Sequence, residues 1–223
     1  LVRRLLENGA NSSFVNRFLD KQTPVEELLN DTRTEVTSTF PYQHKGIPIP
    51  ERIFEAAGEM RKNARGIDLD SAHETQVLLN HAEKFSKDLL LTHSIVNGEN
   101  AEHELKQYFN PADHSDLIGH FSAASQDDVL QTLETAYTAQ SSWNAKGHTY
   151  RADILDKVAN YMENDCANLI TIIANEAGRT LNDGLSEVRE AIDFCRYYAT
   201  QARHMNMESS LELQGQGVFL CIS

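Results

Sequence analysis

The sequence contains few of the residues from which metal and redox sites are built. Only three cysteines occur among 223 residues. Cys166, Cys195 and Cys221 are widely spaced and form no Cys-x-x-Cys pair, so we expect reduced thiols with structural roles. The nine histidines include no His-x-x-x-His or His-Glu-x-x-His pattern, the spacing of a helical metal site. The sequence therefore predicts no metal centre.

Long apolar runs and an excess of positive charge are also missing. No stretch approaches the roughly 18 consecutive apolar residues of a membrane-spanning helix, and the first residues lack the cleavage pattern of a signal peptide. The formal charge of −13 at pH 7 disfavours contact with nucleic-acid phosphates or anionic lipid. A hydrophobic content of 40% is enough for a core, so we expect a globular cytoplasmic protein.

Both ends of the sequence have the pattern of interrupted elements. Helical apolar spacing begins at Leu1 with no capping residue before it. At the other end, residues 218–222 form the continuous apolar run of a doubly buried parallel strand. Gly215 and Gly217 precede this run, whereas the glycines of a dinucleotide-binding fingerprint follow a strand, so they predict a turn. We therefore expect an internal fragment of a larger α/β protein.

Helical periodicity dominates the interior of the sequence. Apolar residues recur with helical spacing in 53–60 and 75–91. Three further helices are expected to begin at a capping box on Ser125, near Tyr150 and near Asn182. Gly178 is the expected stop of the second of these helices. The helix that follows Ser125 has one apolar face, which predicts burial of Val129, Leu130, Leu133, Ala136 and Tyr137.

Strand patterns are confined to a short region. Residues 103–108 and 117–123 read as strands, and the turn-forming residues Asn110–Asp113 separate them. The predicted fold class is therefore mainly α with a small β-hairpin or meander, as part of an α/β parent. Within the last of the three helices, Leu185, Val188 and Ile192 share one face and are expected in the core.

Two adjacent arginines near the start are the most distinctive charged feature. Arg3 and Arg4 project about 100° apart on a helix, so both guanidinium groups can converge on a carboxylate that lies between them. Glu7 follows within reach as an ion-pair partner. On spacing alone, a solvated and self-paired basic patch is the more ordinary arrangement.

The string LVRRLLENGANSSFVNRF at 1–18 resembles the last helix and exit loop of the proline dehydrogenase barrel in the proline utilization A family of bifunctional flavoenzymes. In that family, two consecutive arginines of this helix bind the carboxylate of proline beside FAD. The resemblance thus implies substrate binding by Arg3 and Arg4. It also implies that Glu7 lies near the flavin and helps to order the site.

The rest of the chain resembles later parts of the same family. IPIPERIF at 47–54 and NARGIDL at 63–69 are similar to the segment between barrel and dehydrogenase. EVREAIDFCRYYA at 187–199 resembles an aldehyde dehydrogenase of the glutamate-semialdehyde type. There, a glutamate at the mouth of the aldehyde site corresponds to Glu190, although the helical pattern equally fits a solvated carboxylate.

The last two residues, Ile222 and Ser223, match the start of a family string whose backbone approaches NAD. The resemblance divides the chain into the last helix and exit of the barrel, a helical interdomain linker, a β-hairpin or meander, the N-terminal helices of the aldehyde dehydrogenase domain and the first strand of the NAD-binding region. The respective ranges are 1–20, 21–96, 97–124, 125–214 and 215–223.

The resemblance implies a parent that oxidises proline to pyrroline-5-carboxylate with FAD, passes electrons to a quinone, and oxidises glutamate semialdehyde to glutamate with NAD. We expect contact of the parent with a membrane during quinone reduction, and a homo-oligomer. The family's nucleophilic cysteine and general base have no counterpart here, so the isolated chain should be inactive and bind neither cofactor tightly. A noncatalytic helical scaffold or docking module, and the leader of a stand-alone aldehyde dehydrogenase, are the alternatives.

Overall fold

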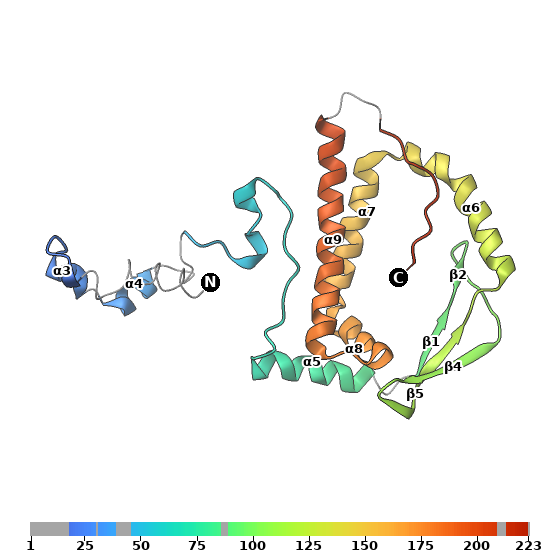
Figure 1. The fold of residues 1–223 in the computed structure, drawn as a ribbon, viewed down its shortest axis with the longest axis horizontal. Coiled ribbons are helices and arrows are strands. Elements are labelled where there is room, and N and C mark those ends of the chain that lie inside the picture. The colour runs from blue at the N-terminus through green and yellow to red at the C-terminus, as the bar shows by residue number, and fades with distance from the viewer. Residues whose placement is uncertain (1–17, 30, 39–45, 86–88, 209–212, 223) are drawn as a thin grey trace. The chain divides into compact units, whose positions relative to one another are not determined.

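The structure is a computed structural model that describes residues 18–29, 31–38, 46–85, 89–208 and 213–222 (Figure 1). The chain divides into two compact units, Leu1–Ile49 and Pro50–Ser223. In the first unit, the described residues form two short helices, α3 (Val25–Leu28) and α4 (Thr32–Ser38). The helix predicted from Leu1 lies almost wholly outside the described residues. No helix in the described ranges is long and apolar enough to cross a membrane.

The second unit is mainly helical. Helices α7 and α9 run side by side, and α8 joins them at one end (Figure 1). Helices are found at all three positions predicted after residue 124, and Gly178 ends α8 in the left-handed conformation (φ 62°) that favours glycine. The second predicted helix is divided in two at Asp165. The helices are α5 (Ala72–Phe85), α6 (Gln126–Ala145), α7 (Gly147–Asn164), α8 (Cys166–Ala177) and α9 (Leu181–Glu208), preceded by 3₁₀ turns η1 (Pro50–Arg52) and η2 (Glu55–Ala57).

The small sheet of this unit is mixed rather than a simple meander. Its strands are β1 (Leu90–His93), β4 (Leu105–Asn110) and β5 (Asp113–Ser122), in the order β1-β5-β4. The central strand β5 pairs antiparallel with β4, as the sequence predicted, and parallel with β1. A separate two-stranded hairpin, β2 (Ile95–Val96) and β3 (Glu99–Asn100), turns through Asn97 and Gly98.

Two predicted helical stretches have a different structure. Residues 53–60 contain only the 3₁₀ turn η2, which Gly58 ends with a φ of 80°. In 75–91, the helix ends at Phe85 and Leu90 begins strand β1. Pairing of β1 with β5 overrides the helical spacing there, and Gly119 allows it because a Cβ atom at 119 would overlap the Leu90 carbonyl.

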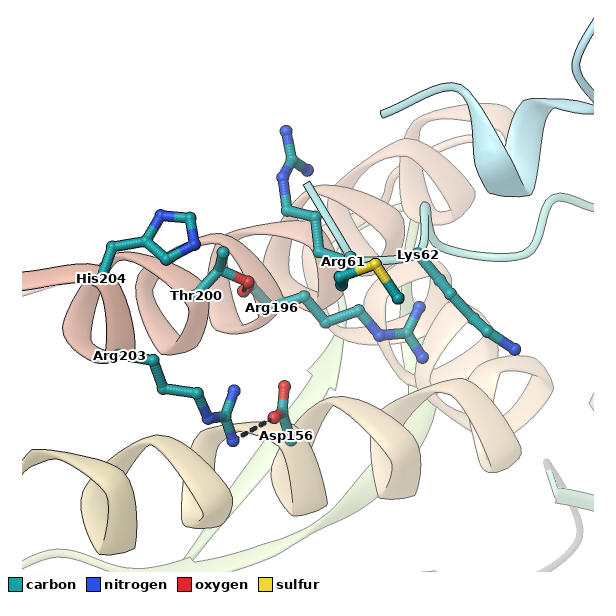
Figure 2. A pocket seen from close by; sticks show the side chains of 8 residues that line it. Arg61, Lys62, Asp156, Arg196, Thr200, Arg203 and His204 are labelled. Carbon is teal, nitrogen blue, oxygen red and sulfur yellow. Dashed lines mark hydrogen bonds and ion pairs between the residues drawn. The ribbon is translucent and has the colours of Figure 1, made fainter. Parts of the chain in front are cut away.

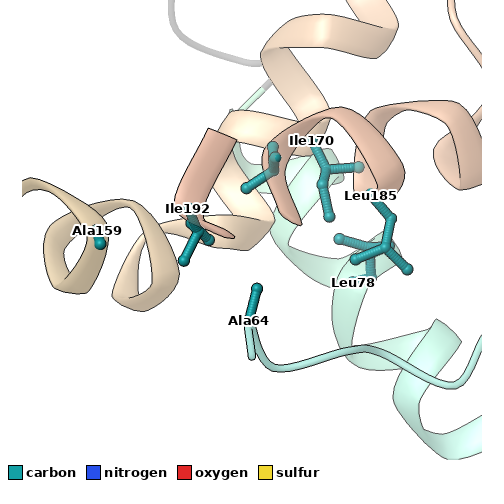
Figure 3. Packing of buried hydrophobic residues seen from close by; sticks show 7 residues of the cluster. Ala64, Leu78, Ala159, Ile170, Leu185 and Ile192 are labelled. Atoms are coloured by element: carbon teal, nitrogen blue, oxygen red, sulfur yellow. The ribbon is translucent and has the colours of Figure 1, made fainter. Parts of the chain in front are cut away.

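The core of the second unit lies where α9 packs against α7 and α8, with α5 packed against α8. The predicted apolar face of α9 is buried, with Ile192 fully enclosed. Ala64, in the extended segment before α5, also enters this core, and Figure 3 shows it pointing towards the cluster. The buried residues are Ala64, Leu78, Ala159, Ile170, Leu185, Val188 and Ile192.

Two apolar segments predicted to be buried are exposed. No residue of α6 is buried, and Tyr137 on its apolar face is 75% exposed. The segment 218–222 forms no strand, and its apolar side chains are exposed. Periodicity specifies which face of an element can be buried, but burial needs a neighbouring surface and a strand needs a partner's backbone groups. The burial predicted for α6 is therefore wrong for this chain, and the strand predicted at 218–222 for the parent, where partner strands would be present, stays a prediction.

The start of α6 is stabilised by the predicted cap, in its reciprocal form. The Ser125 hydroxyl accepts a hydrogen bond from the Asp128 amide (3.2 Å), and the Asp128 carboxylate accepts from the Ser125 amide (2.7 Å). His103 lies 2.5 Å from the same carboxylate. The hydrogen bonds from Ser125, followed by that of His103, lower the pKa of Asp128 to about 2.

We expect Ser125→Ala to lower the free energy of unfolding by about 1 kcal/mol, because it removes the hydroxyl of the cap. Denaturant unfolding followed by circular dichroism at pH 7 measures this change. A depressed carboxyl pKa adds stability above its ordinary value and loses it below, so the difference from wild type should shrink between about pH 4 and pH 2.

Ser142→Ala is the matched control, since Ser142 lies on the same helix and its hydroxyl bonds only the Ala139 carbonyl one turn back. This substitution should leave the unfolding free energy within about 0.5 kcal/mol of wild type. Equal losses for both serines would mean that the cap has no special role.

Candidate functional site

Of the six residues predicted to bind substrate or cofactor, two are described. Arg3, Arg4 and Glu7 lie outside the described residues, as does Ser223. Glu190 is on α9 and Ile222 is in the segment that follows it, and both are exposed. The candidate site is therefore built from the surroundings of Glu190 and of the segment 213–222.

The surface around Glu190 adjoins an extended segment, residues 63–66. Arg189, the residue before Glu190, packs over Gly66: its guanidinium carbon is 3.8 Å from the position that a Cβ atom on Gly66 would occupy. One turn further along α9, the Asp193 carboxylate accepts a hydrogen bond from the Ala64 amide (2.6 Å). The Glu190 side chain itself faces solvent, opposite the buried Val188 and Ile192. It is thus an accessible carboxylate on a helix that contacts of Arg189 and Asp193 hold in place.

An ion pair between a buried arginine and a partly buried glutamate fixes the same segment to α7 and α9. Arg196 on α9 is only 8% exposed, and its guanidinium donates to both Glu163 oxygens on α7 (2.7 and 3.2 Å). It also donates to the Asn63 carbonyl (3.3 Å). Glu163 accepts a further hydrogen bond from the Arg65 amide (2.7 Å). The hydrogen bonds from Arg196, followed by that from Arg65, lower the pKa of Glu163.

A cavity of about 410 Å³ lies between α7, α9 and residues 60–62 (Figure 2). Figure 2 shows the Arg203 guanidinium directed at Asp156, at 2.7 Å, and Asp153 accepts from the same nitrogen (2.6 Å). Arg61, Lys62 and Arg196 in the wall also have carboxylate partners, on Glu59, Glu51 and Glu163 respectively. The charges are therefore compensated, and the cavity is not an anion site on its electrostatics. Its lining residues are Met60, Arg61, Lys62, Asp156, Arg196, Thr200, Arg203 and His204.

A second cavity, of about 450 Å³, lies between α5 and the start of α8. Cys166 is in its wall beside Glu163, and burial, followed by the charge of Glu163, raises the pKa of the Cys166 thiol. A raised pKa makes a thiol a poorer nucleophile. The three cysteines are unpaired, and no cluster of metal-ligating side chains is found within the described ranges.

The segment 213–222 is held at the junction of α6 and α7. The Gly215 amide donates to the Asn144 side-chain oxygen (2.7 Å), and a ring nitrogen of His148 lies 3.3 Å from the Leu213 carbonyl. Sequence reasoning missed these contacts. The only local signal was Gly215, where a Cβ atom would lie 3.2 Å from the Asn144 oxygen.

Comparison with known proteins assigns the class. The aldehyde dehydrogenase family profile matches residues 96–221, more than half of the sequence. The chain belongs to the aldehyde dehydrogenase family.

Within that class, the sequence is homologous to PutA. It is 38% identical to bifunctional protein PutA of Escherichia coli (strain K12) over 91% of this chain and 16% of that protein. It is 33% identical to 1-pyrroline-5-carboxylate dehydrogenase 2 of Bacillus subtilis (strain 168), over 54% of this chain and 23% of that protein. Proline utilization A from Bdellovibrio bacteriovorus has a similar structure, with a TM-score of 0.73 and 27% identity over 92% of this chain and 20% of that one.

The resemblance predicted from the sequence is therefore confirmed. The match to PutA extends over 91% of the chain, which includes most of the stretch before residue 96 that the aldehyde dehydrogenase profile does not match. The chain spans 16% of the length of the PutA proteins that it matches.

We expect Arg196→Ala to lower the free energy of unfolding by about 2 kcal/mol, because it leaves Glu163 partly buried and without its main partner. Denaturant unfolding at pH 7 measures the loss. Since the pKa of Glu163 is lowered in the folded protein, the pair contributes above the ordinary glutamate pKa, and the difference should diminish as the pH falls below that value.

Arg179→Ala is the control for this substitution. Arg179 and Glu187 form an ion pair at 3.5 Å with both side chains largely exposed, and such pairs contribute little. Its unfolding free energy should stay within about 0.5 kcal/mol of wild type. The assigned role of the buried pair would be refuted by two arginine variants of equal stability.

Proposed function

We propose that this chain is a segment of a bifunctional proline-catabolic oxidoreductase. The parent oxidises proline to pyrroline-5-carboxylate with FAD, passes the electrons to a quinone, and oxidises glutamate semialdehyde to glutamate with NAD. The observation that carries the proposal is the similarity to PutA over 91% of the chain. A stand-alone aldehyde dehydrogenase with an unrelated leader gives no reason for the part of this similarity that precedes residue 96.

The proposed proline site uses the two adjacent arginines. Arg3 and Arg4 bind the proline carboxylate, because a guanidinium is permanently charged and offers two parallel donors to a carboxylate. Glu7 lies beside the flavin and orders the site. FAD, when bound, accepts the electrons of proline, while these residues of the chain only hold and orient the substrate.

The proposed aldehyde site uses Glu190 as a contact at its mouth. Glutamate semialdehyde carries an α-ammonium group, and an accessible carboxylate attracts such a cation. The exposure of Glu190 and the fixed position of α9 support this role. Ile222 and Ser223 begin the family string whose backbone approaches NAD. Ile222 is 88% exposed, which leaves it accessible to a dinucleotide.

The segment 63–69 has a positioning role in this proposal. Hydrogen bonds from the amides of Ala64 and Arg65, and to the carbonyl of Asn63, tie it to α7 and α9. A linker between two catalytic domains adopts one conformation only where it packs against one of the domains. A scaffold function for this stretch is thus compatible with the enzymatic function of the parent.

The arginines provide the first test, in the full-length parent. Arg3→Ala and Arg4→Ala should each lower kcat/KM for proline about tenfold to hundredfold, since each removes charge-assisted hydrogen bonds to the substrate. NAD-dependent aldehyde oxidation should not change. Arg33→Ala, on the exposed surface of α4, is the control and should behave as wild type. Normal proline kinetics in both arginine variants would exclude this proline site.

Glu190 is tested by its neutral isostere. Glu190→Gln should raise KM for glutamate semialdehyde several-fold with little change in kcat, since the ammonium contact is lost in ground and transition states alike. Glu187→Gln, one turn earlier on α9, is the matched control because Glu187 pairs with Arg179 instead. Proline oxidation reports that both variants are folded. A KM unchanged by Glu190→Gln would reject the contact.

A further inference from the structure

The junction of α6 and α7, residues 144–151, is built around a reversal of the chain. Gly147 has a φ of 81°, which favours glycine and turns the chain out of α6 into α7. Arg151 then donates back to the carbonyls of Trp143 and Asn144 (3.4 and 3.1 Å), the last groups of α6. The Lys146 amide at the C-cap also bonds these carbonyls, so the guanidinium adds a second, charged donor at the helix end.

The same arginine determines how His148 bonds. One Arg151 nitrogen lies 3.2 Å from His148 Nδ1. A guanidinium can only donate, so Nδ1 must be the acceptor and the ring proton is on Nε2. Nε2 therefore donates to the Leu213 carbonyl at 3.3 Å. Hydrogen bonds thus connect the end of α6 to Arg151, Arg151 to His148, and His148 to the backbone of the segment 213–222.

Asn144 makes the second contact with that backbone. Its side-chain oxygen accepts the Gly215 amide at 2.7 Å. A carbonyl and the amide two residues later point to the same edge of an extended chain, where a neighbouring strand would bond them. His148 and Asn144 thus supply the donor and the acceptor that an adjacent strand would supply. Gly215 allows the close approach, since a Cβ atom there would lie 3.2 Å from the Asn144 oxygen and 3.4 Å from Gln140 Nε2.

We propose that Asn144 is a positioning residue for NAD binding, because it fixes the chain seven residues before Ile222. This inference rests on the proposed function, in which Ile222 and Ser223 lie beside NAD. The junction does not touch the cofactor. It restricts where the chain can enter the NAD-binding strand, so that the backbone at 222 needs less ordering when NAD binds.

The test uses the full-length parent and NADH, whose fluorescence reports binding directly. Asn144→Ala should raise the Kd for NADH about fivefold to tenfold, the equivalent of one lost hydrogen bond. Hydrogen exchange should become faster at the Gly215 amide. KM for proline should not change. Asn144→Asp keeps the acceptor oxygen and should recover most of the lost affinity.

Asn168→Ala is the matched control, since Asn168 is on α8 and bonds only Asp165; its Kd for NADH should equal that of wild type. Gly215→Ala tests the contact from the other side and should weaken NADH binding in the same direction. Faster exchange at Gly215 with unchanged Kd would overturn the inference while leaving the proposed function intact. A wild-type parent that does not bind NADH would instead refute the proposed function.

Discussion

The arrangement of the second unit depends on one buried ion pair. Arg196 and Glu163 join α9 to α7, and both side chains also form hydrogen bonds with the backbone of the extended segment that precedes α5. Burial of a guanidinium costs free energy unless its donors are satisfied, so Arg196 holds its partners on α7 and in the extended segment close to α9. The ion pair therefore ties a segment without secondary structure to both helices.

Arg196 lies on the same helix, α9, as Glu190 of the proposed aldehyde site. The Asp193 carboxylate accepts a hydrogen bond from the Ala64 amide, and Arg189 lies over Gly66. Residues before and after Glu190 on α9 therefore contact the extended segment. The backbone at Glu190 therefore has a well-defined position, even though the Glu190 side chain itself faces solvent. Function at this surface thus depends on packing that lies behind it.

The predictions from sequence succeeded where the signal is local. The cap at Ser125 joins residues three positions apart, and the stop at Gly178 directly follows the last residue of α8. Both have the predicted form. Periodicity also identified the buried face of α9. It failed at Leu90, where pairing with β5 prevails, and at Val129 on α6, where no surface covers the predicted face. The predicted roles of Arg3, Arg4, Glu7 and Ser223 remain predictions, because these residues lie outside the described ranges.

The sequence by itself determined the family of this chain, its negative charge and the positions of most of its helices. Motif strings and periodicity are properties of residues that are close together in the sequence, so no tertiary structure is needed to recognise them. The tertiary structure alone decided which distant groups meet. Arg196 bonds a carbonyl 133 residues away, and Asp193 an amide 129 residues away. Nothing in the spacing of such residues indicates their contact, since it arises from packing of the helices between them. The acceptor role of Asn144 towards Gly215 became visible for the same reason.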